Sequence, residues 1–428
     1  MRDQARVYLR FMLRLIVVLA LAATMAACGQ ATPPPGGGDE IRLIDPDGSN
    51  DRSLWAHGEN DDLEVYDVWS TAWNPQATRL TFASNHENWC SLFASDIFSV
   101  GADGSQYQRI TQAPACAELA DYPQGIVRVP VRNDSFDSFS GFMYYQGAAS
   151  LQPLNLPPNG TGMITFPSVA DFGSGEDWLQ VGTVIADGNR EIMFSSIADV
   201  QGGGSVTTTE VGVYYPGSFW EAHSPTWQQD GSSVTFIYNF SSFYALPKLP
   251  SPLDFGTELM SPDAGFPLFV DLLARGPTAA TANDILYAGT DSFESTAVYL
   301  VSDGSTTAGE PLVSYDGLEA ILGLAWMPDG SGFVYSVTEG DYFSEERSAN
   351  IFHYDFASGA TNRLTNSVGD FAGPMSVSGD GTRIVFEGAS AQVEFSEDLL
   401  DPDLYILDLG TMTVELLVEG ARAPAWSW

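Results

Sequence analysis

Apolar and polar residues alternate in short runs along most of the chain, and tight-turn residues separate the runs. In Ala325–Val337 (AWMPDGSGFVYSV), an apolar run ends at Trp326, a Pro-Asp-Gly turn follows, and Phe333, Tyr335 and Val337 then occupy every second position. A period of two is typical of a strand with one buried face. Proline presets φ at the first corner of a turn, and the Asp-Gly pair suits its tip. The stretch therefore predicts a β-hairpin.

This hairpin pattern recurs along the chain. Copies are anchored at Trp73, Ile185, Trp227, Ala282, Trp326 and Val377, with the weakest copy beginning at Ala280. An apolar strand, a small turn and a short strand follow several copies, as at 96–112, 350–366 and 403–420. From Ile185 onward, successive anchors lie 42 to 55 residues apart. Four short strands repeated at this period are typical of a β-propeller, and a β-sandwich with coincidental Asp-Gly turns is the alternative.

The repeat also resembles a known family. Its order is Trp-x-Pro-Asp-Gly, Ile/Val-x-Phe, Asp-Ile-Phe and Arg-Ile-Thr, and the best copies are residues 73–112 and 325–366. This order resembles the TolB-type propeller repeat, a relative of the WD40-like repeat. The resemblance covers most of the chain and is loose in residues 186–275. It implies an all-β propeller fold, which hosts many functions.

The two ends of the repeat region predict ring closure. Residues 39–56 match the outer half of a blade, and the C-terminal PAWSW matches an innermost strand. Together they would form one composite blade and leave no open sheet edge at the seam. Six anchors and the composite predict seven blades, with six or eight as alternatives.

One gap breaks the period, because Trp73 and Ile185 lie 112 residues apart. The excess falls in residues 117–181, where alternating runs are separated by turn residues such as Asn159 and Gly160. We expect an inserted immunoglobulin-like β-sandwich here, and one more blade with a long loop is the alternative. The propeller would then comprise residues 39–116 and 182–428.

The N-terminus has the pattern of a targeting segment. Its first 14 residues carry four arginines, residues 15–23 (LIVVLALAA) are apolar, and MAAC ends at Cys28. Small residues before this cysteine resemble a bacterial lipobox, although Met25 stands where leucine is usual. The resemblance implies a signal peptide over residues 1–27 and lipidation of Cys28; an ordinary signal peptide is the alternative. Residues 28–38 read as a flexible tether, and Gly29 favours the outer membrane if the host has two membranes.

The remaining two cysteines form an even pair. Cys90 follows the second strand of the first blade, and Cys116 follows its last strand. Outside the cytoplasm such a pair predicts a disulfide, here pinning the root of the insert to the blade. A metal site is the less favoured interpretation.

The chain is strongly acidic, with 17 basic and 55 acidic residues and a formal net charge of −38. Lys248 is the single lysine. This charge excludes a generic nucleic-acid binder and argues against docking of the propeller on anionic lipid. Solubility or adaptation to salt would explain it. The Asp-x-Asp-Gly at Asp45–Gly48 could bind Ca²⁺, but Asp-Gly is turn chemistry in this repeat, so a structural turn is the favoured interpretation.

Motifs for catalysis are missing from the sequence. It has no Gly-x-Ser-x-Gly elbow and no glycine loop that opens a helix. Its histidines share no metal-ligand spacing; they are His57, His86, His223 and His353. We therefore expect no enzyme, no metal site and no cofactor.

Aromatic stretches among carboxylates occur at 218–223, 238–247 and 339–346. Such stretches suit recognition of proteins or carbohydrates, and filling gaps between blades is the more common alternative. The sequence as a whole predicts a lipid-anchored, extracytoplasmic scaffold that binds an envelope protein. A carbohydrate-binding or carbohydrate-active propeller of the cell envelope is the alternative.

Overall fold

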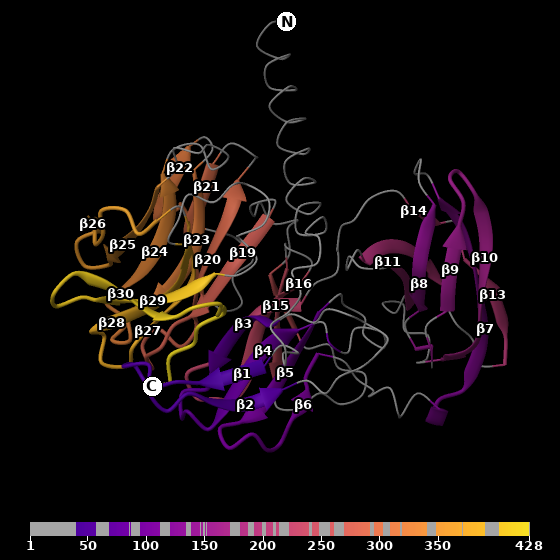
Figure 1. Cartoon of the computed structure of the whole chain (residues 1–428), viewed down its shortest axis with the longest axis horizontal. Coiled ribbons are helices and arrows are strands. Elements are labelled where there is room, and N and C mark those ends of the chain that lie inside the picture. Colours follow the sequence, from indigo (N-terminus) through magenta and orange to yellow (C-terminus); the bar gives the residue numbers. More distant parts are fainter. Residues whose placement is uncertain are drawn as a thin grey trace, which may run out of the picture.

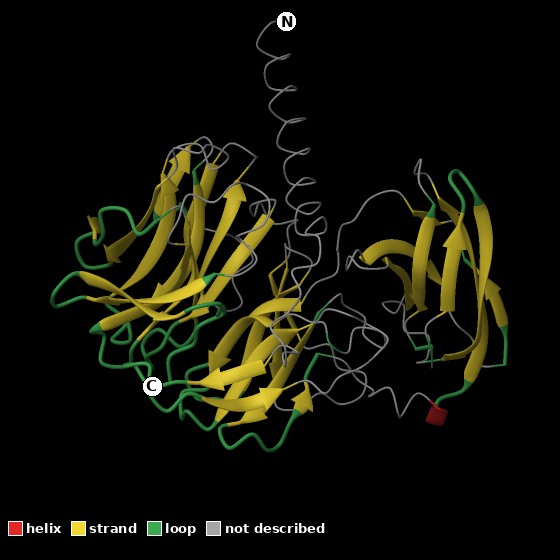
Figure 2. Ribbon diagram, viewed as in Figure 1, coloured by secondary structure: helices red, strands yellow, loops and turns green. Residues whose placement is uncertain are grey.

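The computed structural model describes the chain between residues 40 and 427 with gaps. The described ranges are 40–56, 68–84, 86, 95–111, 120–133, 138–145, 147–148, 150, 152–171, 180–186, 192–198, 203–208, 211–213, 222–238, 242–247, 257–260, 269–291, 295–302, 309–316, 319–339, 348–369, 371–389 and 402–427. Over these ranges the elements are β-strands, apart from a 3₁₀ turn that includes Ala120 and Asp121 (Figure 2). The predicted all-β class is confirmed.

Five sheets share one plan, in which four antiparallel strands pair in chain order. Blade 1 is β3 (Val68–Trp73), β4 (Arg79–Ser84), β5 (Asp96–Gly101) and β6 (Gln108–Arg109). Blade 2 is β15 (Ala222–Trp227), β16 (Ser233–Tyr238), β17 (Ser242–Pro247) and β18 (Thr257–Met260). Blade 3 is β19 (Phe269–Arg275), β20 (Asp284–Asp291), β21 (Ser295–Ser302) and β22 (Val313–Asp316). Blade 4 is β23 (Ala320–Trp326), β24 (Gly332–Glu339), β25 (Ser348–Asp355) and β26 (Ala360–Arg363), and blade 5 is β27 (Phe371–Val377), β28 (Arg383–Ala389), β29 (Asp403–Asp408) and β30 (Thr413–Val418). Repeated four-stranded meanders of this kind are the blades of a β-propeller.

Each blade carries an aromatic pair between its second and third strands. The directly opposed residues are Phe82 and Phe98, Phe236 and Tyr244, Tyr287 and Tyr299, Tyr335 and Phe352, and Phe386 and Tyr405. The ring centroids of Phe82 and Phe98 are 5.5 Å apart, and those of Tyr335 and Phe352 are also 5.5 Å apart. Opposed aromatic side chains stabilise a sheet through area burial and ring contact. The Phe of the repeat motif is therefore a core residue.

The Asp-Gly turns of the repeat are built by side-chain hydrogen bonds. In blade 4, Asp329 accepts the backbone N–H of Ser331 at 2.9 Å, and Gly330 adopts a φ of 74°. In blade 5, Asp380 accepts both the N–H and the hydroxyl of Thr382. The hydrogen bonds from Ser331 lower the pKa of Asp329, and those from Ser378 and Thr382 lower the pKa of Asp380. The turn residues thus fix the register between the first and second strands.

Hydrogen bonds link the blades one to the next. The backbone N–H of Ser224 in blade 2 donates to Ser70 Oγ in blade 1, and the N–H of Arg275 in blade 3 donates to Thr226 Oγ1 in blade 2. Trp326 Nε1 in blade 4 donates to the carbonyl of Ala274 in blade 3. Each link joins a side chain of one first strand to the backbone of a neighbouring one, so adjacent blades are connected at their first strands.

The first described hairpin and the C-terminal segment lie near the junction of blades 5 and 1. The hairpin of β1 (Glu40–Leu43) and β2 (Arg52–Ala56) packs Ile41 and Leu54 against the core of blade 1. The C-terminal residues 421–427 form no described strand. The carbonyl of Ala423 accepts a hydrogen bond from Thr71 Oγ1 of blade 1, while the N–H of Trp426 donates to Ser376 Oγ of blade 5. The C-terminal segment therefore bridges the last and first blades.

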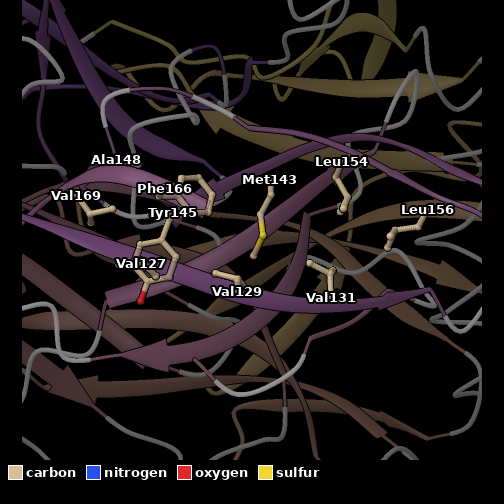
Figure 3. Packing of buried hydrophobic residues seen from close by; sticks show 10 residues of the cluster. All are labelled: Val127, Val129, Val131, Met143, Tyr145, Ala148, Leu154, Leu156, Phe166 and Val169. Carbon is tan, nitrogen blue, oxygen red and sulfur yellow. The ribbon is translucent and has the colours of Figure 1, made fainter. Parts of the chain in front are cut away.

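A second unit is formed by the strands between blades 1 and 2. These are β7 (Gln124–Asn133), β8 (Phe139–Tyr145), β9 (Gln152–Leu156), β10 (Thr161–Ala170), β11 (Gln180–Ala186), β12 (Ile192–Ala198), β13 (Ser205–Thr207) and β14 (Val211–Val213). One sheet has the order β10-β7-β13, with β14 also parallel to β7; the other has the order β12-β11-β8-β9. Side chains from both sheets, including Val129, Tyr145 and Phe166, form a core of their own (Figure 3). In Figure 1 these strands stand apart from the blades.

Ile185 does not begin a blade, contrary to the sequence-based count. It lies in β11, opposite Ile192 of β12 on one side and Phe142 of β8 on the other. Strands of this second unit also continue beyond residue 181, to Val213. The hairpin motif around Ile185 forms as expected, but hairpin chemistry is local and does not select the strand that pairs with its free edge.

Candidate interaction surface

Only some of the site residues predicted from the sequence lie within the described ranges. Cys28, Cys90, Cys116 and His57 lie outside the described residues, so the lipidation and disulfide predictions stay predictions. The three described histidines lie in blades 1, 2 and 4. Over the described part of the chain, no group of three or more His, Cys, Asp or Glu side chains is placed to hold a metal ion.

His86 lies in an aromatic cluster beside blade 1. Its Nδ1 is 2.8 Å from Ser84 Oγ, and its Nε2 is 2.7 Å from the hydroxyl of Tyr107. The imidazole ring is 4.2 Å from Phe98 and 4.9 Å from Trp55, measured between ring centroids. The side chain is buried and both ring nitrogens have partners, so His86 is a packing residue that ties the β1–β2 hairpin to the blade.

His223 and His353 have different surroundings. His223 lies in β15, where burial lowers its pKa to about 4, and its Nδ1 is 3.0 Å from Ser224 Oγ. The imidazole is therefore neutral at neutral pH. His353 is half-buried in β25, opposite Val334 and Asn362. Both histidines therefore lie on strands of different blades.

The Asp45–Gly48 stretch forms a turn with its own internal hydrogen bonds. The N–H of Gly48 donates to the carbonyl of Asp45, and the N–H of Ser49 donates to the Asp47 carboxylate. Asn50 Nδ2 donates to the Asp45 carboxylate. The hydrogen bonds from Ser49 lower the pKa of Asp47. The two carboxylates thus take part in a structural turn of the kind seen in the blades.

The aromatic stretches do not form one surface within the described part. Residues 218–221 and 340–346 lie outside it. Residues 242–247 of the second aromatic stretch are strand β17 of blade 2. Tyr244 there lies opposite Phe236 in the strand register, so this stretch belongs to a blade.

Blade 1 closes its outer edge with an arginine. Arg109 of β6 lies opposite Phe98, and its guanidinium carbon is 5.9 Å from the centre of that ring. Its Nη2 is 2.6 Å from the Asp96 carboxylate, with only 7% and 1% of the two side chains exposed. Thr111 Oγ1 donates to the other oxygen of Asp96 at 2.6 Å. The Asp and Arg-Ile-Thr parts of the repeat motif therefore make one buried polar network over the aromatic pair.

Blade 4 has the same arrangement, except that the acid is Glu339 of the second strand and an asparagine stands at the position of Asp96. Arg363 of β26 lies opposite Phe352, 5.7 Å from the centre of its ring. It pairs with Glu339 at 2.9 Å, and Asn350, at the position of Asp96, donates to the same carboxylate. The cation again covers the aromatic pair and again meets an acid.

Blade 5 differs at this position. Leu416 of β30 lies opposite Tyr405, where blades 1 and 4 have arginine. Asp403, at the position of Asp96, accepts the backbone N–H of Gly420 at 2.9 Å and is in no described ion pair. Leu416 is 49% exposed, and Val414 and Met412 beside it are 38% and 48% exposed. The outermost strand of blade 5 therefore presents an apolar stripe at a sheet edge that pairs with no further strand in the described part of the chain. This surface was not predicted from the sequence, although it was readable there as Leu-Leu-Val where residues 109–111 are Arg-Ile-Thr and residues 363–365 are Arg-Leu-Thr.

Comparisons with known proteins report fold only. No family model matches the chain, and no curated protein matches it. TolB from Acinetobacter baumannii is similar over 73% of each chain, at 14% identity and a TM-score of 0.36. A putative TolB from Agrobacterium tumefaciens matches 48% of this chain and 66% of its own, at 19% identity and a TM-score of 0.36. The predicted TolB-like propeller is confirmed at the level of fold, and the five repeated sheets, not these scores, carry that assignment.

One sequence-based prediction is corrected. Oligogalacturonate lyase from Vibrio parahaemolyticus is similar over 89% of this chain and 85% of its own, at 11% identity and a TM-score of 0.38. An enzyme is among the similar propellers, so neither a propeller fold nor the missing motifs exclude catalysis. The prediction that the protein is not an enzyme is therefore wrong. The activity of that lyase is a property of that protein and is not transferred at this identity.

The described residues contain no helix that is long and apolar enough to span a membrane.

Proposed function

We propose that this protein is a lipid-anchored, extracytoplasmic β-propeller that acts as a protein-interaction scaffold in the cell envelope. The observation that carries the proposal is the apolar outer edge of blade 5, where Met412, Val414 and Leu416 are exposed on and beside β30. Natural edge strands are usually protected by charges, proline or a covering segment. Exposed apolar side chains on an unprotected edge are typical of a surface that binds another protein.

The scaffold would be a ring of six units. In this arrangement the five blades are joined by a sixth, composite unit, with residues 421–427 on its inside and the β1–β2 hairpin further out. The hydrogen bonds of Ala423 to Thr71 and of Trp426 to Ser376 support this closure. A closed ring has a fixed shape, so surfaces on different blades keep their spacing.

The second unit would be an inserted immunoglobulin-like module that extends from about residue 120 to residue 213. Its two sheets share one apolar core that includes Val127, Met143 and Leu154. Met163 of β10 is 54% exposed on its outer face. The module would offer a second contact surface, and a Cys90–Cys116 disulfide would hold its root to blade 1.

Lipidation of Cys28 would attach the protein to the membrane, and residues 29–38 would let the propeller stand away from the lipid. The strongly acidic composition is consistent with this arrangement, because it keeps the propeller off an anionic membrane surface. The membrane would be the outer one if the host has two.

The test compares the full chain with a Cys28→Ser variant in the native host. After mild cross-linking, membranes are extracted and the protein is recovered with an antibody raised against it. We expect the wild type in the membrane fraction with a protein partner in near-stoichiometric amount, and Cys28→Ser in the soluble fraction. Wild type recovered alone would contradict the scaffold function, and membrane retention of the serine variant would contradict the anchor.

A further inference from the structure

The outer edge of blade 5 keeps the acid and the aromatic ring of the polar network seen in blade 1, but it lacks both the arginine and the threonine of that network. In blade 1, Asp96 and Phe98 of the third strand are covered by Arg109 of the fourth. In blade 5 the equivalent acid and ring are Asp403 and Tyr405, and the fourth strand supplies a leucine. The acid is retained without the side chain that neutralises it in blade 1.

The described hydrogen bonds of Asp403 do not use all the acceptor positions of its carboxylate. The side chain is half-buried, accepts one backbone N–H from Gly420, and lies 3.4 Å from the hydroxyl of Tyr405. A carboxylate has about four acceptor positions. A partly buried carboxylate gains most from a cation that can donate hydrogen bonds to it, which favours a guanidinium group.

The backbone edge of β30 that pairs with no described strand sets a second requirement for a ligand of this surface. β30 pairs with β29 on one side only, so the other edge of its backbone is not used within the sheet. Val414 and Leu416 occupy alternate positions on the face that also carries Tyr405 and Leu407 across the ladder. In blade 4 the positions of Val414 and Leu416 are held by Thr361 and Arg363, which make that edge polar.

We propose that blade 5 binds an extended segment of a partner protein, which pairs with β30 as a fifth strand and places an arginine against Asp403. The proposal rests on the interaction-scaffold function and names the partner's chemistry. Alternate apolar side chains of the segment would cover Val414 and Leu416, while backbone hydrogen bonds supply affinity along the edge. The net charge of −38 favours a basic partner and disfavours a second copy of the same acidic chain.

The test uses a variant that restores the arginine of blades 1 and 4. Leu416→Arg gives blade 5 its own cation for Asp403, and the 49% exposure of Leu416 means that little core packing is lost. The matched control is Thr361→Lys, which adds a charge to the equivalent strand of blade 4. Circular dichroism and thermal unfolding confirm that each full-length variant is folded.

The probe is a fluorescent octapeptide in which valine and threonine alternate around one central arginine. Two matched peptides carry citrulline or glutamate in place of that arginine. Fluorescence anisotropy with the full chain in detergent at physiological salt is expected to show binding that weakens about tenfold or more for Leu416→Arg and for the glutamate peptide, with citrulline between them. Thr361→Lys is expected to bind like the wild type.

Failure of the inference is separable from failure of the scaffold function. Equal binding by the wild type and Leu416→Arg, equal binding of the arginine and glutamate peptides, or no peptide binding at all would overturn the proposed edge site. If Leu416→Arg still recovers the native partner after cross-linking, the scaffold function stands and this site is wrong. If wild type recovers a partner and Leu416→Arg does not, both are supported.

Discussion

Glu387 lies at the seam where the last blade meets the C-terminal segment. It is on β28 and is 7% exposed, and its carboxylate accepts the backbone N–H of Ala423. Ala423 in turn accepts a hydrogen bond from Thr71 of blade 1. Burial, partly offset by that N–H and by the charge of Arg422, raises the pKa of Glu387 from 4.5 to about 7. The charge state of this one side chain is therefore linked to the stability of the seam.

The sign of the linkage follows from the raised pKa. Between pH 4.5 and 7 the folded protein keeps the proton on Glu387 while the unfolded chain loses it, so the free energy of unfolding falls as pH rises through this window. One pKa unit corresponds to about 1.4 kcal/mol, and a shift of roughly two and a half units gives about 3 kcal/mol. This contribution is fully present below pH 4.5 and is lost above pH 7.

Glu387→Gln removes the titration while the amide oxygen can still accept the N–H of Ala423. Urea unfolding followed by tryptophan fluorescence at pH 5, 6, 7 and 8 gives the difference in unfolding free energy between variant and wild type. We expect this difference to move in favour of the variant by about 3 kcal/mol between pH 5 and pH 8. Glu415→Gln, on the exposed strand β30, controls for the loss of one negative charge. A difference that stays constant across this pH range would refute the linkage.

Three further predictions concern the blades and the second unit. Arg109→Met should lower the free energy of unfolding by about 3 to 5 kcal/mol, because it leaves the buried Asp96 carboxylate without its cation; chemical denaturation measures this, and a loss below 1 kcal/mol would contradict a buried pair. Phe166→Ala should lower the free energy of unfolding of the second unit by about 3 to 5 kcal/mol and leave the blades unchanged, since Phe166 lies in the separate core of that unit. Calorimetry should show that one unfolding transition moves, and a shift of every transition would show that the units unfold together. Gly330→Ala should cost about 1 to 2 kcal/mol, because φ is 74° and the added methyl would lie 3.2 Å from Thr278; an unchanged melting temperature would argue against strain at this turn.

The local hairpins could be predicted from the sequence because their chemistry is local. Alternation around Phe333 and Tyr335 and the Asp329-Gly330 turn predicted a strand, a turn and a strand, and the structure has β23, that turn and β24. The same reasoning predicted the strands on either side of the Asp380-Gly381 turn in blade 5. In each case a side chain bonds to backbone two residues away, so no distant residue is needed to specify the turn.

Contacts between residues distant in the sequence decided which strands share a sheet and which surface stays exposed. The hairpin around Ile185 looks like the start of a blade, yet its edge pairs with β8, about 40 residues earlier in the chain. Which edge a strand joins depends on the burial of both faces of the sheet, a property that no short window contains.

The apolar edge at Leu416 could have been noticed as a departure from Arg-Ile-Thr. Its meaning needed the register, because only the pairing with Tyr405 and the position of Asp403 show that an expected cation is missing. The sequence by itself determined the strands, the turns and the repeat, because these depend on neighbouring residues. The tertiary structure alone decided the membership of each sheet and the surface left open, because both depend on packing between residues far apart in the chain.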